Sequence, residues 1–171
     1  MKLFRARDMM IPLDKYPHMP HWFTMRQALA EMEHTEFDVG GRKSLPRVVL
    51  VFDEEYSLLG IVRRRDILRG LEPGFLSKVL SESERWEEET GQRDKETTAR
   101  VLEMIKDRAE RPISDVMMRL ETTVDIDDTI IAIANKIVDN NVSLLPVLED
   151  GKVVGVVRTV EILHEVAKVV G

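Results

Sequence analysis

Apolar residues follow two different spacings along the chain, and each spacing predicts its own kind of element. Within residues 25–32 the apolar side chains recur every three or four positions, which is the spacing of one helix face. Thr24 precedes this segment as an N-cap, and Gln27 follows three residues later, which is the pattern of a capping box. Residues 47–52 are instead almost entirely apolar, so they predict a buried strand that pairs with a second strand over 58–62.

The same order of elements returns in the last third of the chain. A short helix over 66–71 closes the first series, and residues 36–44, with two consecutive glycines, are expected to be a flexible loop. In the second series either Asp127 or Asp128 is expected to cap a helix that ends at the asparagine pair 140–141. The elements predicted there are a helix over 129–138, strands over 143–148 and 153–157, and a helix over 160–169.

Two stretches carry nearly the same motif, which indicates two copies of one unit. Residues 58–68 and 153–163 both contain two apolar residues, a glycine, two β-formers, an arginine, two variable positions, an acid, isoleucine and leucine. A shorter echo precedes each copy, at 8–11 and at 115–118. The order in each copy is strand, helix, strand, strand, helix, so we expect function where the two copies meet.

Residues 72–111 have no counterpart in either copy and are rich in charge. Their apolar residues keep helical spacing, so they predict two amphipathic helices with a break near Thr90 and Gly91. Amphipathic helices most often pack on their own protein, which makes a cover over an exposed face of the core the simpler interpretation. A dedicated docking site for another protein is the alternative.

Composition sets the class of protein without changing this picture. The chain has 171 residues, 43% hydrophobic and 33% charged, which is typical of a soluble globular protein with one core or two units that share one. It has no cysteine, which excludes disulfides, thiolate metal sites and a cysteine nucleophile. The net charge of −6 disfavours nucleic acid as a partner. No segment has the apolar length of a signal peptide or membrane span, so we expect a cytoplasmic protein without a membrane partner.

The double motif resembles the cystathionine-β-synthase (CBS) domain, which occurs in tandem pairs. The resemblance rests on the order Asp-x-Met, capped helix, Pro-Val strand and Gly-containing strand before an acid, found twice. It implies an α+β fold in which two β-α-β-β-α units pack sheet to sheet about a pseudo-twofold axis. The first unit would span residues 1–71, a helical insert 72–111 and the second unit 112–171. It also implies two symmetric clefts for adenosine-containing ligands such as AMP, ADP, ATP or S-adenosylmethionine, and a disc-shaped homodimer.

The repeated stretch also carries the chemistry of a ligand site. An acid in the first turn of a helix can accept hydrogen bonds from a ribose diol, while the free N–H groups and arginines beside it attract phosphate. In the resembled family an aspartate here binds ribose hydroxyls, and Asp66 matches it, whereas the second copy has Glu161. Where the family has Thr or Ser, this chain has Arg63 and Arg158, which either bind an anion or pair with a neighbouring acid. A plain acid at the positive end of a helix is the simpler interpretation, and it is favoured at Glu161.

Further candidates come from the basic cluster and from the cleft walls that the resemblance implies. The three successive arginines at 63–65 form the densest basic cluster of an acidic chain, which points towards phosphate or an acidic partner surface. The remaining ligand-binding candidates are Arg65 from this cluster, Ile61 from the repeated strand, and Met10, Ile11, Arg47, Val48, Met118, Pro146 and Val147 as walls.

These features predict a stand-alone, non-catalytic regulatory module. An adenosine-containing ligand, rather than an obligatory cofactor, would bind beside Asp66 and Arg63 and change how the two units or the homodimer pack, which an unidentified protein partner would sense. An enzyme is not expected, because the sequence offers no activated nucleophile and no metal-ligand pattern among its four histidines. The alternative is a structural or partner-docking assembly protein whose clefts are closed by its own arginines.

Overall fold

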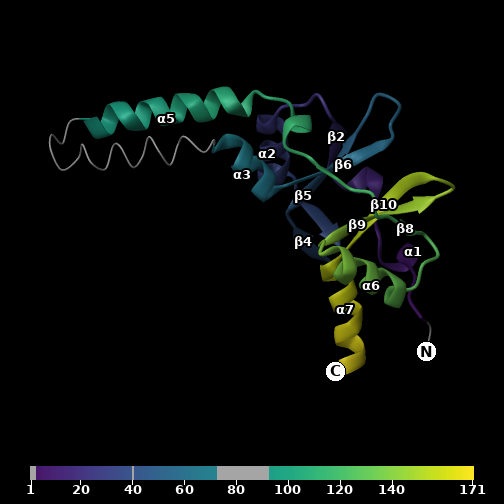
Figure 1. Cartoon of the computed structure of the whole chain (residues 1–171). Coiled ribbons are helices and arrows are strands. Elements are labelled where there is room, and N and C mark those ends of the chain that lie inside the picture. The colour runs from purple at the N-terminus through teal and green to yellow at the C-terminus, as the bar shows by residue number, and fades with distance from the viewer. Residues whose placement is uncertain (1–2, 40, 73–92) are drawn as a thin grey trace.

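The computed structural model describes residues 3–39, 41–72 and 93–171, which form two four-stranded sheets with helices packed on them (Figure 1). The first sheet has the order β2-β5-β6-β7 and the second the order β1-β10-β9-β8. The strands of the first sheet are β2 (His18–Pro20), β5 (Val48–Phe52), β6 (Leu58–Arg63) and β7 (Met118–Arg119). Those of the second are β1 (Ile11–Pro12), β8 (Val124–Asp125), β9 (Leu144–Glu149) and β10 (Lys152–Arg158). The predicted strand pairs and the α+β class are confirmed.

The helices follow the predicted order within each copy. In the first copy they are α1 (Ala6–Met9), the short 3-10 helix η1 (Leu13–Lys15), α2 (Met25–His34) and α3 (Arg64–Leu71). After the insert they are η2 (Ile113–Asp115), α6 (Ile130–Asn140) and α7 (Thr159–Val170). None of the described helices is both long and apolar enough to cross a membrane.

Each sheet takes one edge strand from the other half of the chain. β1, at the N-terminal end, pairs antiparallel with β10, and β7, after the insert, pairs antiparallel with β6. The two repeated glycines stand at these crossings, where a Cβ on Gly60 would overlap the carbonyl oxygen of Met118 and one on Gly155 that of Ile11. Glycine is therefore required in both copies of the motif by close backbone contact between the halves.

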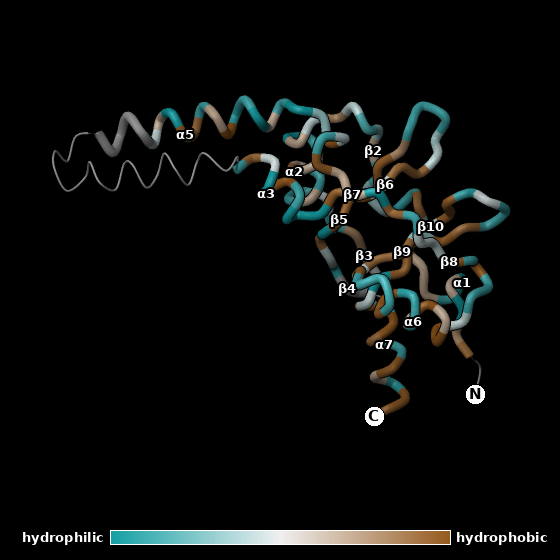
Figure 2. The backbone as a smooth tube through the Cα atoms, viewed as in Figure 1, coloured by the Kyte–Doolittle hydropathy of each residue, from teal (hydrophilic) through white to brown (hydrophobic). Residues whose placement is uncertain are grey.

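Strand β5 is buried on both faces, which explains why its residues are continuously apolar. Val49 and Val51 pack in the core of the first unit, beneath α2 and α3. Val48, Leu50 and Phe52 point the other way, into a cluster that also holds Leu144 and Val156 of the second unit and joins the two sheets. Figure 2 shows the same concentration of apolar positions along the central strands.

The N-cap predicted from the sequence is correct for α2 and incorrect for α6. At α2 the predicted capping box is confirmed, since Thr24 Oγ1 accepts from Gln27 N at 3.2 Å and Thr24 N donates to Gln27 Oε1 at 2.9 Å. At α6 the prediction was wrong: Thr129 is the N-cap, and its Oγ1 accepts from Ala132 N at 3.3 Å. Asp128 instead accepts from the backbone N–H of residue 125, in the turn before the helix.

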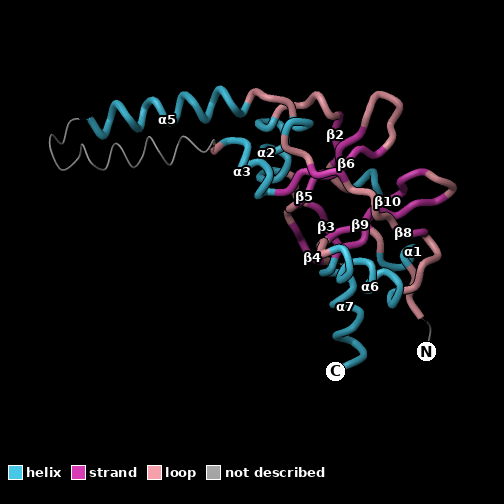
Figure 3. The backbone as a smooth tube through the Cα atoms, viewed as in Figure 1, coloured by secondary structure: helices cyan, strands magenta, loops and turns pink. Residues whose placement is uncertain are grey.

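The predicted loop over 36–44 is also corrected, because it forms a two-stranded hairpin of β3 (Phe37–Val39) and β4 (Arg42–Ser44) (Figure 3). Gly41, at φ +83°, provides the left-handed conformation that the tight turn needs, and its N–H donates to Asp38 Oδ1 at 2.8 Å. Phe37, only 7% exposed, anchors the hairpin in the cluster between the two sheets.

The second of the two insert helices is confirmed as α5 (Arg93–Ala109), while the first falls outside the described residues. The C-terminal end of α5 contacts the core, where Arg108 Nε donates to Gly70 O at 2.7 Å, and just after the helix Glu110 pairs with Arg26. The rest of α5 projects away from both sheets, and Leu102 on it is 52% exposed. The described part of the insert contacts α2 and α3 through its C-terminal end, and the expected cover over an exposed face of the core stays a prediction.

Candidate functional site

Two cavities occupy related positions, one beside each copy of the repeated motif. The Arg63 cleft has a volume of about 410 Å³ and is lined by Arg47, Val48, Ile61, Arg63, Arg64, Arg65, Met118, Asn141, Val142 and Ser143. The Arg158 cleft has a volume of about 490 Å³ and is lined by Asp8, Met9, Met10, Lys43, Ser44, Arg158, Val160, Glu161, His164, Glu165 and Lys168. Both volumes fall within the range of about 300–1,000 Å³ that is common for small-ligand pockets.

The Arg63 cleft is built by both halves of the chain. β6 runs into α3 here, so Arg63 at the end of the strand and the two arginines in the first turn of the helix line the opening, and β5 contributes Val48 to the floor. Met118 arrives on the exchanged strand β7, where it pairs with Ile61. The segment 141–143 of the second unit forms the far wall, after Asn141 ends α6 in the left-handed conformation at φ 51°. A ligand here would therefore contact both units.

Asp66 lies beneath this cleft rather than in its wall, and its side chain is fully buried. Its Oδ2 accepts from the backbone N and the Nε of Arg63, both at 2.9 Å. Its Oδ1 accepts from Nη2 of Arg63 at 2.9 Å and from Nη2 of Arg69 at 3.2 Å. A carboxylate has about four acceptor positions, so these four bonds use its whole capacity. Asp66 thus caps the start of α3 and fixes Arg63.

The same contacts set the charge state of the pair. Burial favours the neutral acid, but the hydrogen bonds and charge of Arg63 outweigh burial and hold the pKa of Asp66 below its ordinary value. The pKa of Arg63 is raised in turn, chiefly by its hydrogen bonds to Asp66. The pair is therefore ionised at neutral pH, and of the two roles that the sequence left open for Arg63, pairing with an acid is observed. Ribose binding by Asp66 stays a prediction.

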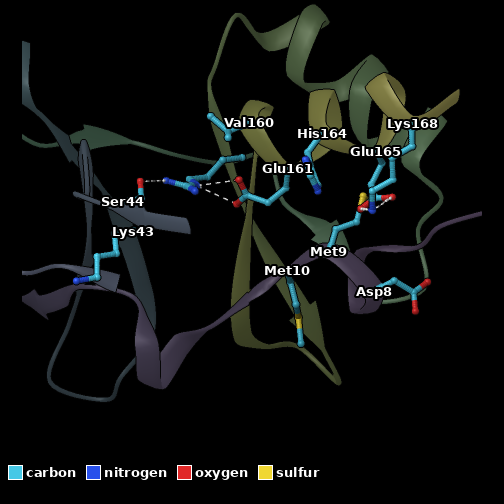
Figure 4. A pocket seen from close by; sticks show the side chains of 11 residues that line it. Asp8, Met9, Met10, Lys43, Ser44, Val160, Glu161, His164, Glu165 and Lys168 are labelled. Atoms are coloured by element: carbon cyan, nitrogen blue, oxygen red, sulfur yellow. Dashed lines mark hydrogen bonds and ion pairs between the residues drawn. The ribbon is translucent and has the colours of Figure 1, made fainter. Parts of the chain in front are cut away.

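In the Arg158 cleft, the arginine is held from both units. Its Nε donates to Glu161 Oε1 at 2.8 Å and Oε2 at 3.1 Å, and its Nη1 donates to Ser44 Oγ at 3.3 Å. The dashed lines from Ser44 and Glu161 meet at this guanidinium in Figure 4. Its Cζ also lies 5.0 Å from the ring centroid of Phe37, at cation–π distance. The side chain of Arg158 is only 13% exposed, so it closes part of its own cleft.

Tyr16 lies buried behind this arrangement and ties it to the first sheet. Its hydroxyl donates to the carbonyl oxygen of Val48 at 2.6 Å, and its ring meets Phe37 edge-on with centroids 5.6 Å apart. Burial raises the pKa of the Tyr16 hydroxyl far above its ordinary value, so the group stays protonated and continues to donate. Sequence patterns gave no indication of this residue, because its role depends on packing between the two sheets.

The structure brings most of the predicted site residues together, but in two separate groups. The group in the Arg63 cleft comprises Arg47, Val48, Ile61, Arg63, Arg65 and Met118, and the group in the Arg158 cleft comprises Met10, Arg158 and Glu161. Ile11, Pro146 and Val147 line neither cleft: Ile11 and Val147 are buried in strands, and Pro146 pairs with Val156 of β10.

Met10 and Met118, which each line the cleft of the opposite unit, were predicted, but other residues lent across the units were not. The residues that were not predicted include Lys43 and Ser44 of the first unit and the segment 141–143 of the second. Both precede the first long strand of their own unit, at equivalent places in the repeat, so the repeat order was the signal that could have located them. Among the described residues, no three His, Asp or Glu side chains gather as a metal site.

Comparison with known proteins identifies the repeated unit. The model of the CBS domain matches residues 23–73 and 113–168. A search of curated proteins gave no significant match. Among solved structures, the chain resembles a putative acetoin utilization protein (AcuB) from Vibrio cholerae, with 18% identity, a TM-score of 0.64, and 99% of this chain and 94% of that one covered.

Two further similar structures contain nucleotides. CBSX2 in complex with AMP is 16% identical, with a TM-score of 0.63 over 98% of this chain and 99% of that one. The cytosolic domain of the Mg²⁺ channel MgtE in complex with ATP is 17% identical, with a TM-score of 0.60 over 94% of this chain and 48% of that one. At these identities the likeness concerns the fold. Two domain matches and the interlocked pair of sheets together show that the chain belongs to the CBS-domain family and carries two CBS domains in tandem.

Proposed function

We propose that the chain is a regulatory module that binds an adenosine-containing nucleotide in the Arg63 cleft and signals by a change in how its two units pack. The observation that carries this proposal is the composition of that cleft. Four arginines stand around an apolar floor of Val48, Ile61 and Met118, a combination that suits a phosphate group and a flat base.

The position of the cleft supports a regulatory role. Its walls come from β6 and α3 of the first unit, from the exchanged strand β7, and from segment 141–143 of the second unit. A ligand that contacts all three binds best in one relative arrangement of the units, and it shifts the population towards that arrangement. A partner that distinguishes the two arrangements is then coupled to the ligand.

The similar structures support the ligand class. CBSX2 was solved with AMP and the MgtE cytosolic domain with ATP, and both share this fold over nearly the whole of this chain. S-adenosylmethionine and ADP complete the panel of ligands that contain adenosine. No obligatory cofactor forms part of the proposal.

Isothermal titration of the full chain with AMP, ADP, ATP and S-adenosylmethionine tests the proposal. We expect saturable heat with at least one of them, abolished by Ser143→Trp, which places an indole at the wall of the Arg63 cleft. Ser57→Trp serves as the matched control, because Ser57 lies in the turn at the opposite end of the β5–β6 hairpin. No saturable signal across the panel with the unsubstituted chain would overturn the proposal.

A structural assembly protein is the second candidate, and the ion pairs favour it specifically. Arg63 and Arg158 both bind an acid of their own helix, as that hypothesis requires. It further requires that the space left beside Arg63 admits no ligand. The titration therefore separates the two functions, since assembly alone predicts no nucleotide binding to a correctly folded chain.

We also propose that the chain forms a homodimer through α6 and α7. Ile131 and Val138, seven residues apart on α6, are 61% and 76% exposed. On α7, Leu163 and Val170 are 59% and 78% exposed at the same spacing. Apolar stripes on neighbouring helices fit the same surface of a second copy related by a twofold axis. Light scattering should give twice the chain mass, and Val138→Glu combined with Leu163→Glu should give the monomer mass.

A further inference from the structure

The two clefts differ sharply in the charge of their linings. The Arg63 cleft is lined by four arginines, and no acidic side chain of the described residues lines it. The Arg158 cleft has a balanced lining, in which three basic residues stand with three acids; these are Lys43, Arg158 and Lys168 with Asp8, Glu161 and Glu165. Two cavities beside the same motif therefore differ in the ligand charge that they favour: the Arg63 cleft favours an anion, and the Arg158 cleft does not.

Within the part of the chain that the structure describes, three of the four arginines in the Arg63 cleft have no counter-charge. Arg47, Arg64 and Arg65 are exposed, and none of them forms an ion pair with another described residue. The chain as a whole carries a net charge of −6, so this concentration of positive charge is local. Clustered guanidinium groups repel one another, and an anion bound between them removes that repulsion.

The fourth arginine, Arg63, is fixed by Asp66 but keeps free N–H donors for an anion. Arg63 uses its Nε and one N–H of Nη2 on Asp66, while a guanidinium has five N–H donors. Its side chain is 29% exposed and lines the cleft, so its remaining donors can reach a ligand. Asp66 is thus a positioning residue for Arg63, and its own acceptors are already filled.

From this charge pattern we infer that the Arg63 cleft selects its nucleotide by the polyphosphate chain, and that each chain binds one ligand. This inference rests on the proposed function and specifies its ligand class. Nucleoside triphosphates bind more tightly than diphosphates and far more tightly than AMP, because each phosphate adds charge for the unpaired arginines. S-adenosylmethionine binds worst, because its sulfonium is positive. The Arg158 cleft stays empty of nucleotide, since Arg158 is already neutralised by Glu161 and held by Ser44.

Titration calorimetry of the full chain with ATP, ADP, AMP and S-adenosylmethionine tests the inference, with inorganic triphosphate as a competitor. We expect one site per chain and an ATP affinity at least about tenfold above that of AMP, from one extra charge-assisted hydrogen bond or more. Inorganic triphosphate should displace ATP, and raising the salt concentration should weaken ATP more than AMP.

Substitutions of single arginines test whether the preference for ATP over AMP arises in the Arg63 cleft. Arg65→Gln and Arg64→Gln should each lower ATP affinity about tenfold and AMP affinity much less, because each removes one charged donor. Lys152→Gln changes the net charge by the same amount at the start of β10, outside the Arg63 cleft, and it should leave both affinities unchanged.

The outcomes separate this inference from the proposed function. Equal affinities for ATP and AMP that Arg65→Gln does not alter would overturn the inference and leave nucleotide binding intact. Tight binding of S-adenosylmethionine, or two equivalent sites per chain, would also overturn it. If no ligand of the panel binds, the proposed function fails with it.

Discussion

The two clefts begin from the same sequence motif, an arginine three residues before an acid, and the structure uses the motif in two different ways. The shorter Asp66 reaches the backbone N–H of Arg63, so it caps α3 and fixes the arginine within one unit. The longer Glu161 binds the Nε of Arg158, whose other end reaches Ser44 of the opposite unit. One pair is a local helix cap, and the other is part of a cross-link between units.

The cause of this difference is the connection that leads into the first long strand of each unit. In the first unit this connection contains the β3–β4 hairpin, which brings Phe37 and Ser44 against Arg158. In the second unit only the segment 141–143 joins α6 to β9, and its residues line the Arg63 cleft without filling it. The longer connection in the first copy thus holds an arginine across part of the Arg158 cleft, whereas among the described residues the shorter connection in the second copy forms no hydrogen bond with Arg63.

Removal of Asp66 or of Glu161 should give the largest losses of stability, and the two losses should differ. Asp66→Ala deletes four hydrogen bonds at a fully buried site, so we expect the free energy of unfolding to fall by about 3 kcal/mol. Glu161→Ala leaves Arg158 its contacts with Ser44 and Phe37, and we expect a loss of about 2 kcal/mol.

Urea denaturation at pH 7 measures both losses. Asp139→Ala, which removes an exposed acid from α6, is the control and should change stability by less than about 0.5 kcal/mol. Equal losses for Asp66→Ala and Glu161→Ala would contradict the distinction between a helix cap and a cross-link.

Substitution of the two repeated glycines tests the close backbone contact that both units make with an exchanged edge strand. Gly60→Ala and Gly155→Ala each push a methyl group into a backbone carbonyl of the exchanged strand, so both should destabilise by about 1–3 kcal/mol. Hydrogen exchange should also show loss of protection at β7 for the first variant and at β1 for the second. Loss of protection in both edge strands from either single variant would show that the crossings are coupled rather than independent.

Elements with strong periodicity were predictable from the sequence, and those that depend on contacts between the units were not. The helix after Thr24 and the apolar strand at 48–52 follow from spacing and capping residues alone. The two-residue strands β1 and β7 are too short to show any period, so their exchange between sheets could not be predicted. The β3–β4 hairpin was missed because its apolar anchor is Phe37, and a single aromatic residue in a polar segment is weak evidence for a strand.

The candidate site was predictable to a similar extent. The repeat located Arg63, Asp66, Arg158 and Glu161 at equivalent places, and the sequence offered two roles for each arginine. The choice between an internal acid and an external anion depends on side-chain geometry, which no spacing encodes. The cap of α6 shows the same limit, since several adjacent residues near Thr129 have suitable oxygen atoms and only the backbone path selects one.

Acid titration isolates the contribution of the Asp66 pair. The pKa of Asp66 is lowered in the folded chain, while an unfolded aspartate titrates near about 3.9. Its stabilisation is therefore complete above the unfolded value and is lost as the pH falls through the folded value. We expect the gap in urea midpoint between the unsubstituted chain and Asp66→Asn to stay constant from pH 6 to 8 and to shrink below about pH 4. A gap that widens in acid would contradict this sign.

The smallest predicted effect concerns the cross-link itself. Ser44→Ala removes the one hydrogen bond that joins this side chain to Arg158, so we expect a loss of about 0.5–1 kcal/mol in urea denaturation. Ser143→Ala is the matched control in the other unit, because Ser143 contributes its backbone carbonyl, which accepts from Thr159 at 2.9 Å and is kept in alanine. A double-mutant cycle of Ser44→Ala with Arg158→Ala should recover most of the Ser44 loss as coupling energy. If Ser44→Ala costs the same with and without Arg158, the hairpin stabilises the second unit through Phe37 packing instead.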